Sequence, residues 1–210
     1  MTKISFLLDE LEDPFNIFPL QSACKYLETL VDDQYSGMAE RSNWWGVSPK
    51  YRTVEDEHDI DVINLFIGSI FVLGQAAITQ AISIVQNLHS ISGSPTWLPK
   101  DRYAIMSTEA ATHAETGLSK IVLFDAVANY FKHHHEWSDT WTGERKDRQR
   151  TIDIVMKLGL TPGNENNLDS AVNNLDMNSK SMSLMAYEIQ NWREQLAKRL
   201  REQFRYHDLS

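Results

Sequence analysis

The chain has 210 residues, 42% of them hydrophobic and 23% charged, with 20 Lys plus Arg against 29 Asp plus Glu. A chain of this length and ordinary composition buries roughly 70% of its unfolded surface, so we expect one domain over 1–210 that needs no disulfide framework. The net charge of −9 excludes a globally basic nucleic-acid-binding protein, and nine Gly and six Pro are too few for a turn-rich sheet protein.

The first 55 residues are predicted to contain a helix and a loop. Apolar residues recur at helical spacing over 20–35, whereas the tryptophan-rich segment 36–54 mixes turn formers with large aromatic residues and is predicted as a loop. The N-terminus reaches acidic residues after four apolar ones, which is too short for a secretory leader. Cys24 is the single cysteine, so we expect a cytoplasmic protein.

A long apolar helix is predicted from about Asp56 to about Ser90. Residues 62–86 carry no charge and are long enough to cross a bilayer. Their polar residues lie on one helix face, however, and the preceding residues 55–61 are acidic. We therefore expect a buried helix of a bundle and no membrane association.

Residues 92–99 contain two prolines and a glycine, which end the long helix. A second long helix is predicted from about Lys100 to about His135, with Gly117 as the point where it kinks or splits. The two helices would form an antiparallel hairpin over 56–135.

Residues 145–206 are predicted to add further helices. After a charged segment, three helices are predicted: one over 151–158, a weaker one over 168–176, and a long amphipathic one over 181–204. No alternating strand pattern occurs, which excludes a nucleotide-binding parallel sheet. The fold class is therefore all-α, a helical bundle built on two long antiparallel helices with additional flanking helices.

The run Lys132-His133-His134-His135-Glu136 is the densest group of titratable side chains. Adjacent residues of a helix point about 100° apart, so the run alone is no chelate. The predicted hairpin would place His133 opposite Glu57, His58 and Asp59. A metal-dependent hydrolase using His58, His133 and His135 is therefore one hypothesis, and a solvated helix end with ion pairs is the other.

Asp125, Asn129 and His133 are spaced by four and form a polar stripe on a helix whose other side is apolar. This predicts a functional surface or a buried polar network. The segment Ala128-Asn129-Tyr130-Phe131-Lys132-His133 resembles the signature of the HEPN superfamily, in which an Arg, commonly a following polar residue, and a later His share one helix.

The resemblance implies an all-α, frequently dimeric protein of a prokaryotic toxin or defence system, in many members a metal-independent endoribonuclease. It implies a catalytic role for His133 and Asn129, with Lys132 in support. Ala128 stands where the family has its Arg, and a methyl group cannot replace a guanidinium. Either the cation comes from elsewhere in the fold or this copy is inactive.

A basic segment follows the histidines and contains four cations, Arg145, Lys146, Arg148 and Arg150. They are predicted to contact RNA phosphates, with Trp137 and Trp141 available to stack on bases. The alternative is a solvated helix start with salt bridges. A second basic segment, 193–205, ends the chain and fits the negative end of a helix dipole.

Three functions are thus expected to compete: a HEPN-like ribonuclease or inactive relative, a non-enzymatic helical interaction or oligomerisation module, and a metal-dependent hydrolase. The first predicts RNA as partner, a homodimer and no cofactor.

Overall fold

The computed structural model describes residues 3–45, 54–93, 95–137, 140–142, 145–177 and 181–208. The helix predicted from residue 56 lies at the centre of the fold. The described part of the chain contains no strand, only an isolated bridge between Thr112 and Ser119. The α-helices are α1 (Lys3–Glu12), α2 (Phe18–Trp45), α3 (Val54–Ile91), α4 (Arg102–Ser107), α5 (Lys120–His133), α6 (Lys146–Lys157), α7 (Asn167–Asn174) and α8 (Ser183–Asp208), with 3₁₀ turns η1 (Pro14–Asn16) and η2 (His134–Glu136). The all-α prediction is confirmed.

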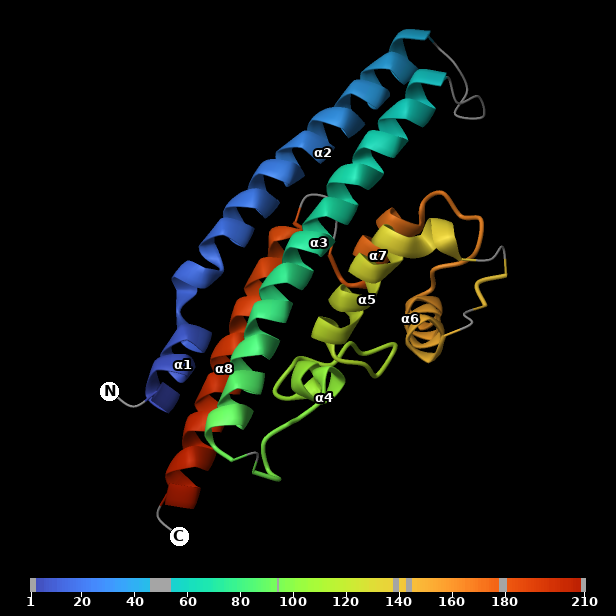
Figure 1. Ribbon diagram of the computed structural model, residues 1–210. Helices are drawn as coiled ribbons and strands as arrows, with labels where there is room; N and C mark the ends of the chain where they lie inside the picture. The colour runs from blue at the N-terminus through green and yellow to red at the C-terminus, as the bar shows by residue number, and fades with distance from the viewer. Residues whose placement is uncertain are drawn as a thin grey trace.

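α3 divides the bundle into two sides. α1, α2 and α8 lie along one side of it, and α4 to α7 lie on the other (Figure 1). Buried apolar residues from all eight helices form one core cluster, in which Ile67, Ile78 and Leu88 of α3 are fully enclosed. α3 is the one helix of the described residues long and apolar enough to cross a membrane, and half of its most apolar stretch is buried inside the bundle.

The long antiparallel partner of α3 is α2, not the predicted helix over 100–135. α2 continues to Trp45, so the predicted loop over 36–54 is wrong for 36–45, and 46–53 lie outside the described residues. Gly37 is accommodated in the helix with only Arg41 near it, and Arg41 forms an ion pair with Asp59 of α3. This contact joins the two helices beyond the point where the apolar periodicity of α2 fades.

The predicted helix over 100–135 is interrupted by a loop. α4 ends at Ser107, Glu109 adopts a left-handed φ of 57°, and the chain resumes as a helix only after Ser119, whose hydroxyl accepts a hydrogen bond from the Val122 amide. Gly117, with φ 67°, lies in the loop and not inside a helix. Because of this interruption, α5 lies at a different position along α3 than one continuous helix would give it. The displacement decides which residues of α3 face the histidines.

The C-terminal helices agree with their predictions, but the final basic segment has an unexpected partner. α8 packs on α1, a helix that the sequence pattern did not reveal. Arg193 is buried and donates to the carbonyl oxygens of Glu10 and Leu11, while Arg201 bonds Asp9 and Glu12. These arginines fasten α8 to α1.

Candidate functional site

The histidine run lies where α5 changes into the 3₁₀ turn η2. His133 closes α5 with φ −128° and ψ −2°, outside helical geometry, and the next three residues form the turn. The side chains of adjacent histidines consequently reach two different cavities. His133 lines the smaller one, and His134 and His135 line the larger one.

The smaller cavity, here called the His133 cavity, lies between the end of α5 and the start of α6. Its volume is about 290 Å³. It is lined by Asn129, His133, Glu136, Trp137, Arg145, Asp147, Arg148 and Thr151. Two residues predicted to be catalytic, His133 and Asn129, are thus brought together with Arg145 and Arg148, two residues predicted to bind RNA.

Glu136 organises the charges of the His133 cavity. Its Oε1 lies 3.0 Å from Nδ1 of His133, and its Oε2 accepts a hydrogen bond from Nη2 of Arg148 at 3.3 Å. The hydrogen bond from His133, and then the charges of His133 and Arg148, hold the pKa of the Glu136 carboxyl below its usual value. An ionised carboxylate only accepts, so His133 carries a proton on Nδ1, and Nε2 of the neutral ring is a base.

This His133–Glu136 pair was not predicted, although Glu136 belongs to the histidine run. The signal was its spacing, since residues three apart share a helix face. An oriented imidazole whose second nitrogen is basic can abstract a proton, and a neighbouring carboxylate stabilises the imidazolium that results.

Of the other three cations of the basic segment, one lines the His133 cavity and two do not. Arg145 forms an ion pair with Asp147 at 2.9 Å within the cavity. Arg150 instead places its guanidinium over the Tyr103 ring, 3.8 Å from the ring centre, and Lys146 is exposed outside the cavity lining. Only two of the four predicted RNA-binding residues therefore meet His133.

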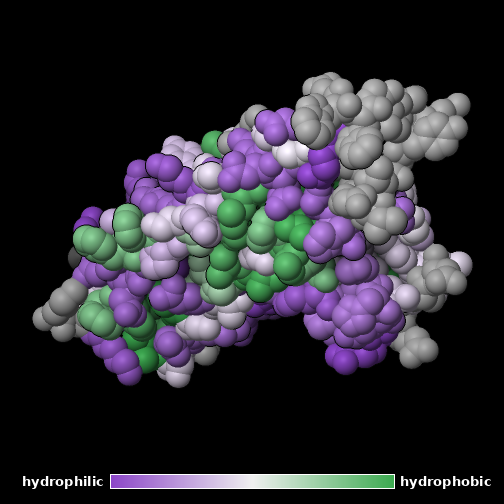
Figure 2. Space-filling view, turned by 90° about the horizontal axis from the view of Figure 1, so that it is seen from above, coloured by the Kyte–Doolittle hydropathy of each residue, from purple (hydrophilic) through white to green (hydrophobic). Residues whose placement is uncertain are grey.

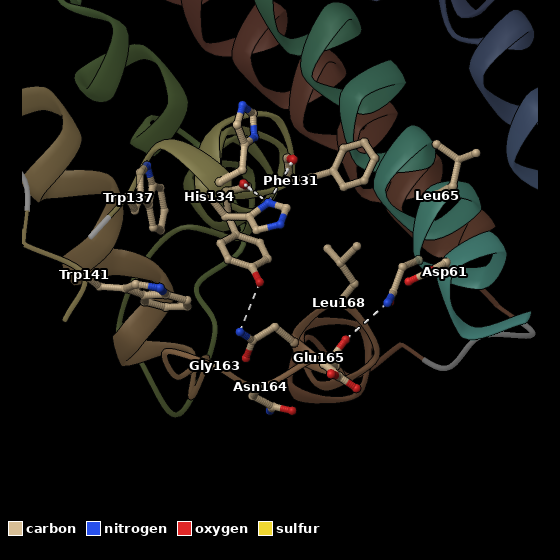
Figure 3. A pocket seen from close by; sticks show the side chains of 14 residues that line it. Asp61, Leu65, Phe131, His134, Trp137, Trp141, Gly163, Asn164, Glu165 and Leu168 are labelled. Carbon is tan, nitrogen blue, oxygen red and sulfur yellow. Dashed lines mark hydrogen bonds between the residues drawn. The ribbon is translucent and has the colours of Figure 1, made fainter. Parts of the chain in front are cut away.

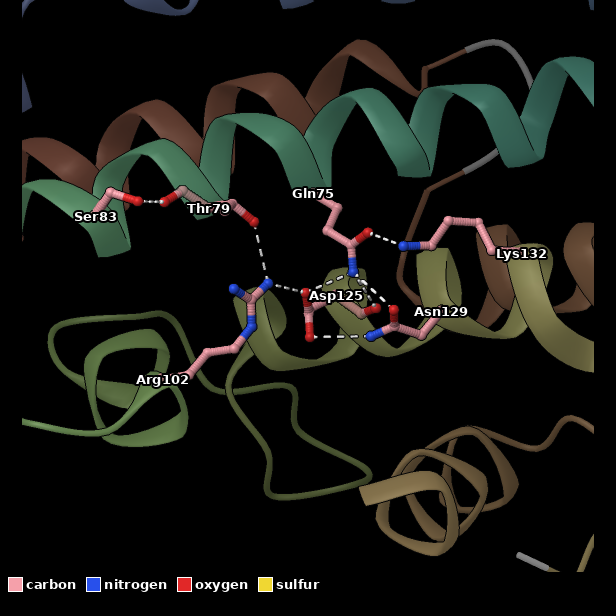
Figure 4. Close-up of polar contacts among 7 residues, drawn as sticks. All are labelled: Gln75, Thr79, Ser83, Arg102, Asp125, Asn129 and Lys132. Atoms are coloured by element: carbon pink, nitrogen blue, oxygen red, sulfur yellow. Dashed lines mark hydrogen bonds and ion pairs between the residues drawn. The ribbon is translucent and has the colours of Figure 1, made fainter. Parts of the chain in front are cut away.

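Asn129 and Lys132 belong to a polar network between α5 and α3 (Figure 4). Gln75 of α3 donates from Nε2 to Oδ1 of Asp125 at 2.8 Å and to Oδ1 of Asn129 at 3.0 Å, and its Oε1 accepts from Nζ of Lys132 at 2.6 Å. Asp125 also accepts from Nη2 of Arg102 at 2.6 Å and from Nδ2 of Asn129 at 3.3 Å. The predicted polar face thus divides into this buried network and, separately, His133.

The network changes the roles expected for two residues. Oδ1 of Asn129 and the ammonium of Lys132 bond to Gln75 and hold α5 against α3, while Nδ2 of Asn129 bonds to Asp125 within α5. We therefore regard Asn129 and Lys132 as positioning residues. Gln75 and Arg102, which complete the network, come from distant helices and were missed, because no local spacing connects them with α5.

The position at which the resemblance to the HEPN superfamily would place an arginine is buried. Ala128 is fully buried in the core, which leaves no place for a guanidinium at this point of α5. Arg145 and Arg148 share a cavity with His133, and Arg148, from α6, also bonds to Glu136. Of the two expectations, a cation supplied from elsewhere therefore has a structural candidate.

The larger cavity, here called the aromatic cavity, lies between α3, the end of α5 and the α6–α7 connection (Figure 3). Its volume is about 660 Å³, and Trp137 lines both cavities. Its other lining residues are Asp61, Asn64, Leu65, Tyr130, Phe131, His134, His135, Trp141, Gly163, Asn164, Glu165, Asn167 and Leu168. Burial raises the pKa of the Tyr130 phenol, whose oxygen accepts a hydrogen bond from Asn167.

The arrangement proposed for a metal does not form. α5 is displaced along α3 so that Phe131 packs against Gly68, and His58 lies ten residues away, roughly 15 Å along the helix. The prediction that His133 faces His58 is therefore wrong, because the loop before α5 shifts the register. No group of three His, Cys, Asp or Glu side chains suited to a metal occurs among the residues whose side chains are described.

Comparisons with known proteins return no matching family model, no curated protein and no solved structure.

Proposed function

We propose that the His133 cavity binds an RNA phosphate and that His133 catalyses metal-independent cleavage of the RNA strand. The observation that supports this is the meeting of an oriented imidazole, His133 with Glu136, and two arginines in one cavity. The resemblance to the HEPN superfamily supplies the reaction class, and Arg148 supplies the charge that Ala128 lacks.

In this mechanism Nε2 of His133 removes the proton from a ribose 2′-hydroxyl, and the 2′-oxygen forms a bond to the adjacent phosphorus. The bond from phosphorus to the 5′-oxygen breaks, and the imidazolium returns the proton to that leaving oxygen. The products are a 2′,3′-cyclic phosphate and a 5′-hydroxyl, so no proton is gained or lost overall. Arg148 stabilises the charge that builds up on the phosphate oxygens.

Glu136 has two opposing effects in this proposal. It orients His133 and stabilises the imidazolium, but it also pairs with Arg148 and repels an incoming phosphate. Glu136→Gln is therefore expected to bind RNA more tightly and to cleave it more slowly. A substitution that only damaged the fold would weaken both.

The test uses the full chain and a structured RNA, with and without EDTA. We expect cleavage that resists EDTA, yields cyclic phosphate ends, disappears in His133→Ala and persists in the control His58→Ala, an exposed histidine outside the lining of both cavities. Cleavage that requires a metal, or no cleavage by any variant, would overturn the proposed activity.

Phosphate binding is tested separately through its salt dependence. Removing both arginines, in Arg145→Ala with Arg148→Ala, is expected to make the slope of log affinity against log salt shallower by about 1.4 for single-stranded RNA. Lys157→Ala, at the far end of α6, is the matched control and should change the slope little.

A non-enzymatic interaction module is the second candidate, favoured by exposed apolar surface. Leu65 and Leu73 of α3 are 54% and 41% exposed. Figure 2 shows a hydrophobic area in the middle of the face seen from above, with hydrophilic residues around it. Sedimentation of the free protein tests whether such a surface forms a homodimer, independently of any cleavage.

A further inference from the structure

The aromatic cavity has the size and wall chemistry of a small-molecule site. Its volume of about 660 Å³ lies within the range of roughly 300–1,000 Å³ that ligand pockets occupy. The cleavage proposed at His133 does not require it, since among the described residues the linings of the two cavities share Trp137 alone.

One wall of this cavity is aromatic and held in place. The rings of Tyr130, Trp137 and Trp141 contact one another, with centres 5.3–5.6 Å apart. Asn167 fixes the Tyr130 hydroxyl through a 3.1 Å hydrogen bond. Trp141 adopts a left-handed φ of 51°, which is costly for a bulky residue and is found where the surroundings impose it.

The opposite wall accepts hydrogen bonds. Asp61 of α3 and Glu165 of the α6–α7 connection lie across the cavity from the tryptophans (Figure 3). No Lys or Arg is among the lining residues in the part of the chain that the structure describes. This wall therefore disfavours phosphate and favours groups that donate hydrogen bonds.

His134 adds a third acceptor between these walls. Its Nδ1 lies 3.2 Å from the carbonyl oxygens of both Tyr130 and Phe131. Carbonyl oxygens only accept, so Nδ1 carries the hydrogen, and Nε2 of the neutral ring has a free lone pair. Figure 3 shows the His134 ring reaching into the space between Phe131 and Leu168.

We propose that the aromatic cavity binds a flat aromatic ring whose edge carries amino groups, as adenine, cytosine and guanine do. The ring would stack on the aromatic wall, and its amino hydrogens would bond to Asp61 and to Nε2 of His134. Uracil has no amino group and offers one donor at this edge, its N3–H, so it would leave one of these two acceptors without a partner. A site that loses its hydrogen-bond partner discriminates strongly against the ligand that lacks it.

Two sources can supply such a ring. It is either a base of the RNA whose phosphate occupies the His133 cavity, reached past the shared Trp137, or a free small molecule. The first source rests on the proposed function, whereas binding of the ring itself does not.

Equilibrium dialysis of the full chain against adenosine, cytidine and uridine tests the inference. We expect adenosine and cytidine to bind at least about tenfold more tightly than uridine, because one hydrogen bond to a charged group is worth about that factor. Asp61→Asn replaces an acceptor by a donor and should remove the preference. Asp153→Asn, a surface carboxylate of α6 outside both cavities, should retain it. Equal binding of the three nucleosides, or binding of none, overturns the inference.

Decaadenylate and decauridylate separate the two sources. If the base belongs to RNA, decaadenylate binds more tightly than decauridylate, and Arg145→Ala with Arg148→Ala weakens both. If both oligonucleotides bind equally and no nucleoside binds, the proposed function stands and this inference fails. If adenosine binds and neither oligonucleotide does, RNA binding fails and the aromatic cavity is a site for a free small molecule.

Discussion

Asp125→Ala is expected to destabilise the protein strongly, because its carboxylate is the common acceptor of the network between α3, α4 and α5. The side chain is 12% exposed and accepts from Gln75, Arg102 and Asn129 at 2.8, 2.6 and 3.3 Å. Its removal leaves buried donors without this partner.

The magnitude follows from the burial of each donor. A hydrogen bond to a charged group is worth about 1.5–3 kcal/mol, and the buried Gln75 amide loses one while it keeps Asn129 as a second acceptor. Arg102 is 40% exposed and can return to water, so its ion pair adds only up to about 1 kcal/mol. We expect Asp125→Ala to lower the free energy of unfolding by about 2–4 kcal/mol.

Urea unfolding followed by circular dichroism measures this change, and an unaltered m-value would show that the unfolded state is unaffected. Asp153→Ala is the control: the carboxylate is exposed on α6 and accepts from Gln149 one turn away, so it should cost less than about 0.5 kcal/mol. A loss below about 1 kcal/mol for Asp125→Ala, or one equal to the control, would refute the reasoning.

Three further changes test the packing that supports the site. Gly68→Ala would place a methyl group 2.2 Å from the Phe131 ring, so it should cost about 1–3 kcal/mol in urea unfolding and alter the aromatic cavity; no loss would contradict this close approach. Burial raises the pKa of the Cys24 thiol to about 12. Ellman's reagent should therefore leave the native protein unmodified at pH 8 and modify it fully in guanidinium. Rapid modification of the native protein would show that the thiol is accessible. Arg193→Met keeps the bulk of the side chain but leaves the carbonyl oxygens of Glu10 and Leu11 without this donor. The free energy of unfolding is therefore expected to fall by about 2–4 kcal/mol in thermal or urea unfolding. Equal stability would show that the cost of burying the charge cancels the gain from its hydrogen bonds.

The helices that could be predicted are those whose apolar periodicity continues without interruption. α3 and α8 were found nearly to their ends, because each buries one face over its length. α1 was missed because three buried leucines within ten residues give little periodic signal. A break at Gly117 was expected, but the length of the loop between α4 and α5 was not, because the left-handed Glu109 and the Thr112–Ser119 bridge stabilise an excursion that composition does not reveal.

The site was predictable only in its local part. The spacing of Asn129 and His133 marked the correct face of α5, and the basic segment that follows proved to share a cavity with it. The partners from α3 and α4 were not predictable, since a displacement of α5 along α3 decides whether Gln75 or the neighbourhood of His58 meets the histidines. Such a register depends on the length and shape of the preceding loop.

The two cavities can be separated experimentally because they depend differently on α5. The network through Asp125 holds the whole helix against α3, so Asp125→Asn, which loses the charge that Arg102 meets, should weaken adenosine binding and RNA cleavage together. Glu136 contacts His133 at 3.0 Å, Arg148 at 3.3 Å and the exposed His135 ring at 4.0 Å, and among the two cavities it lines the smaller one. Glu136→Gln should therefore slow cleavage while the affinity for adenosine in equilibrium dialysis stays within about twofold, a change of about 0.4 kcal/mol. If Glu136→Gln weakened adenosine binding as much as Asp125→Asn does, the turn η2 would move as one unit, and the two cavities would have to be treated as a single site.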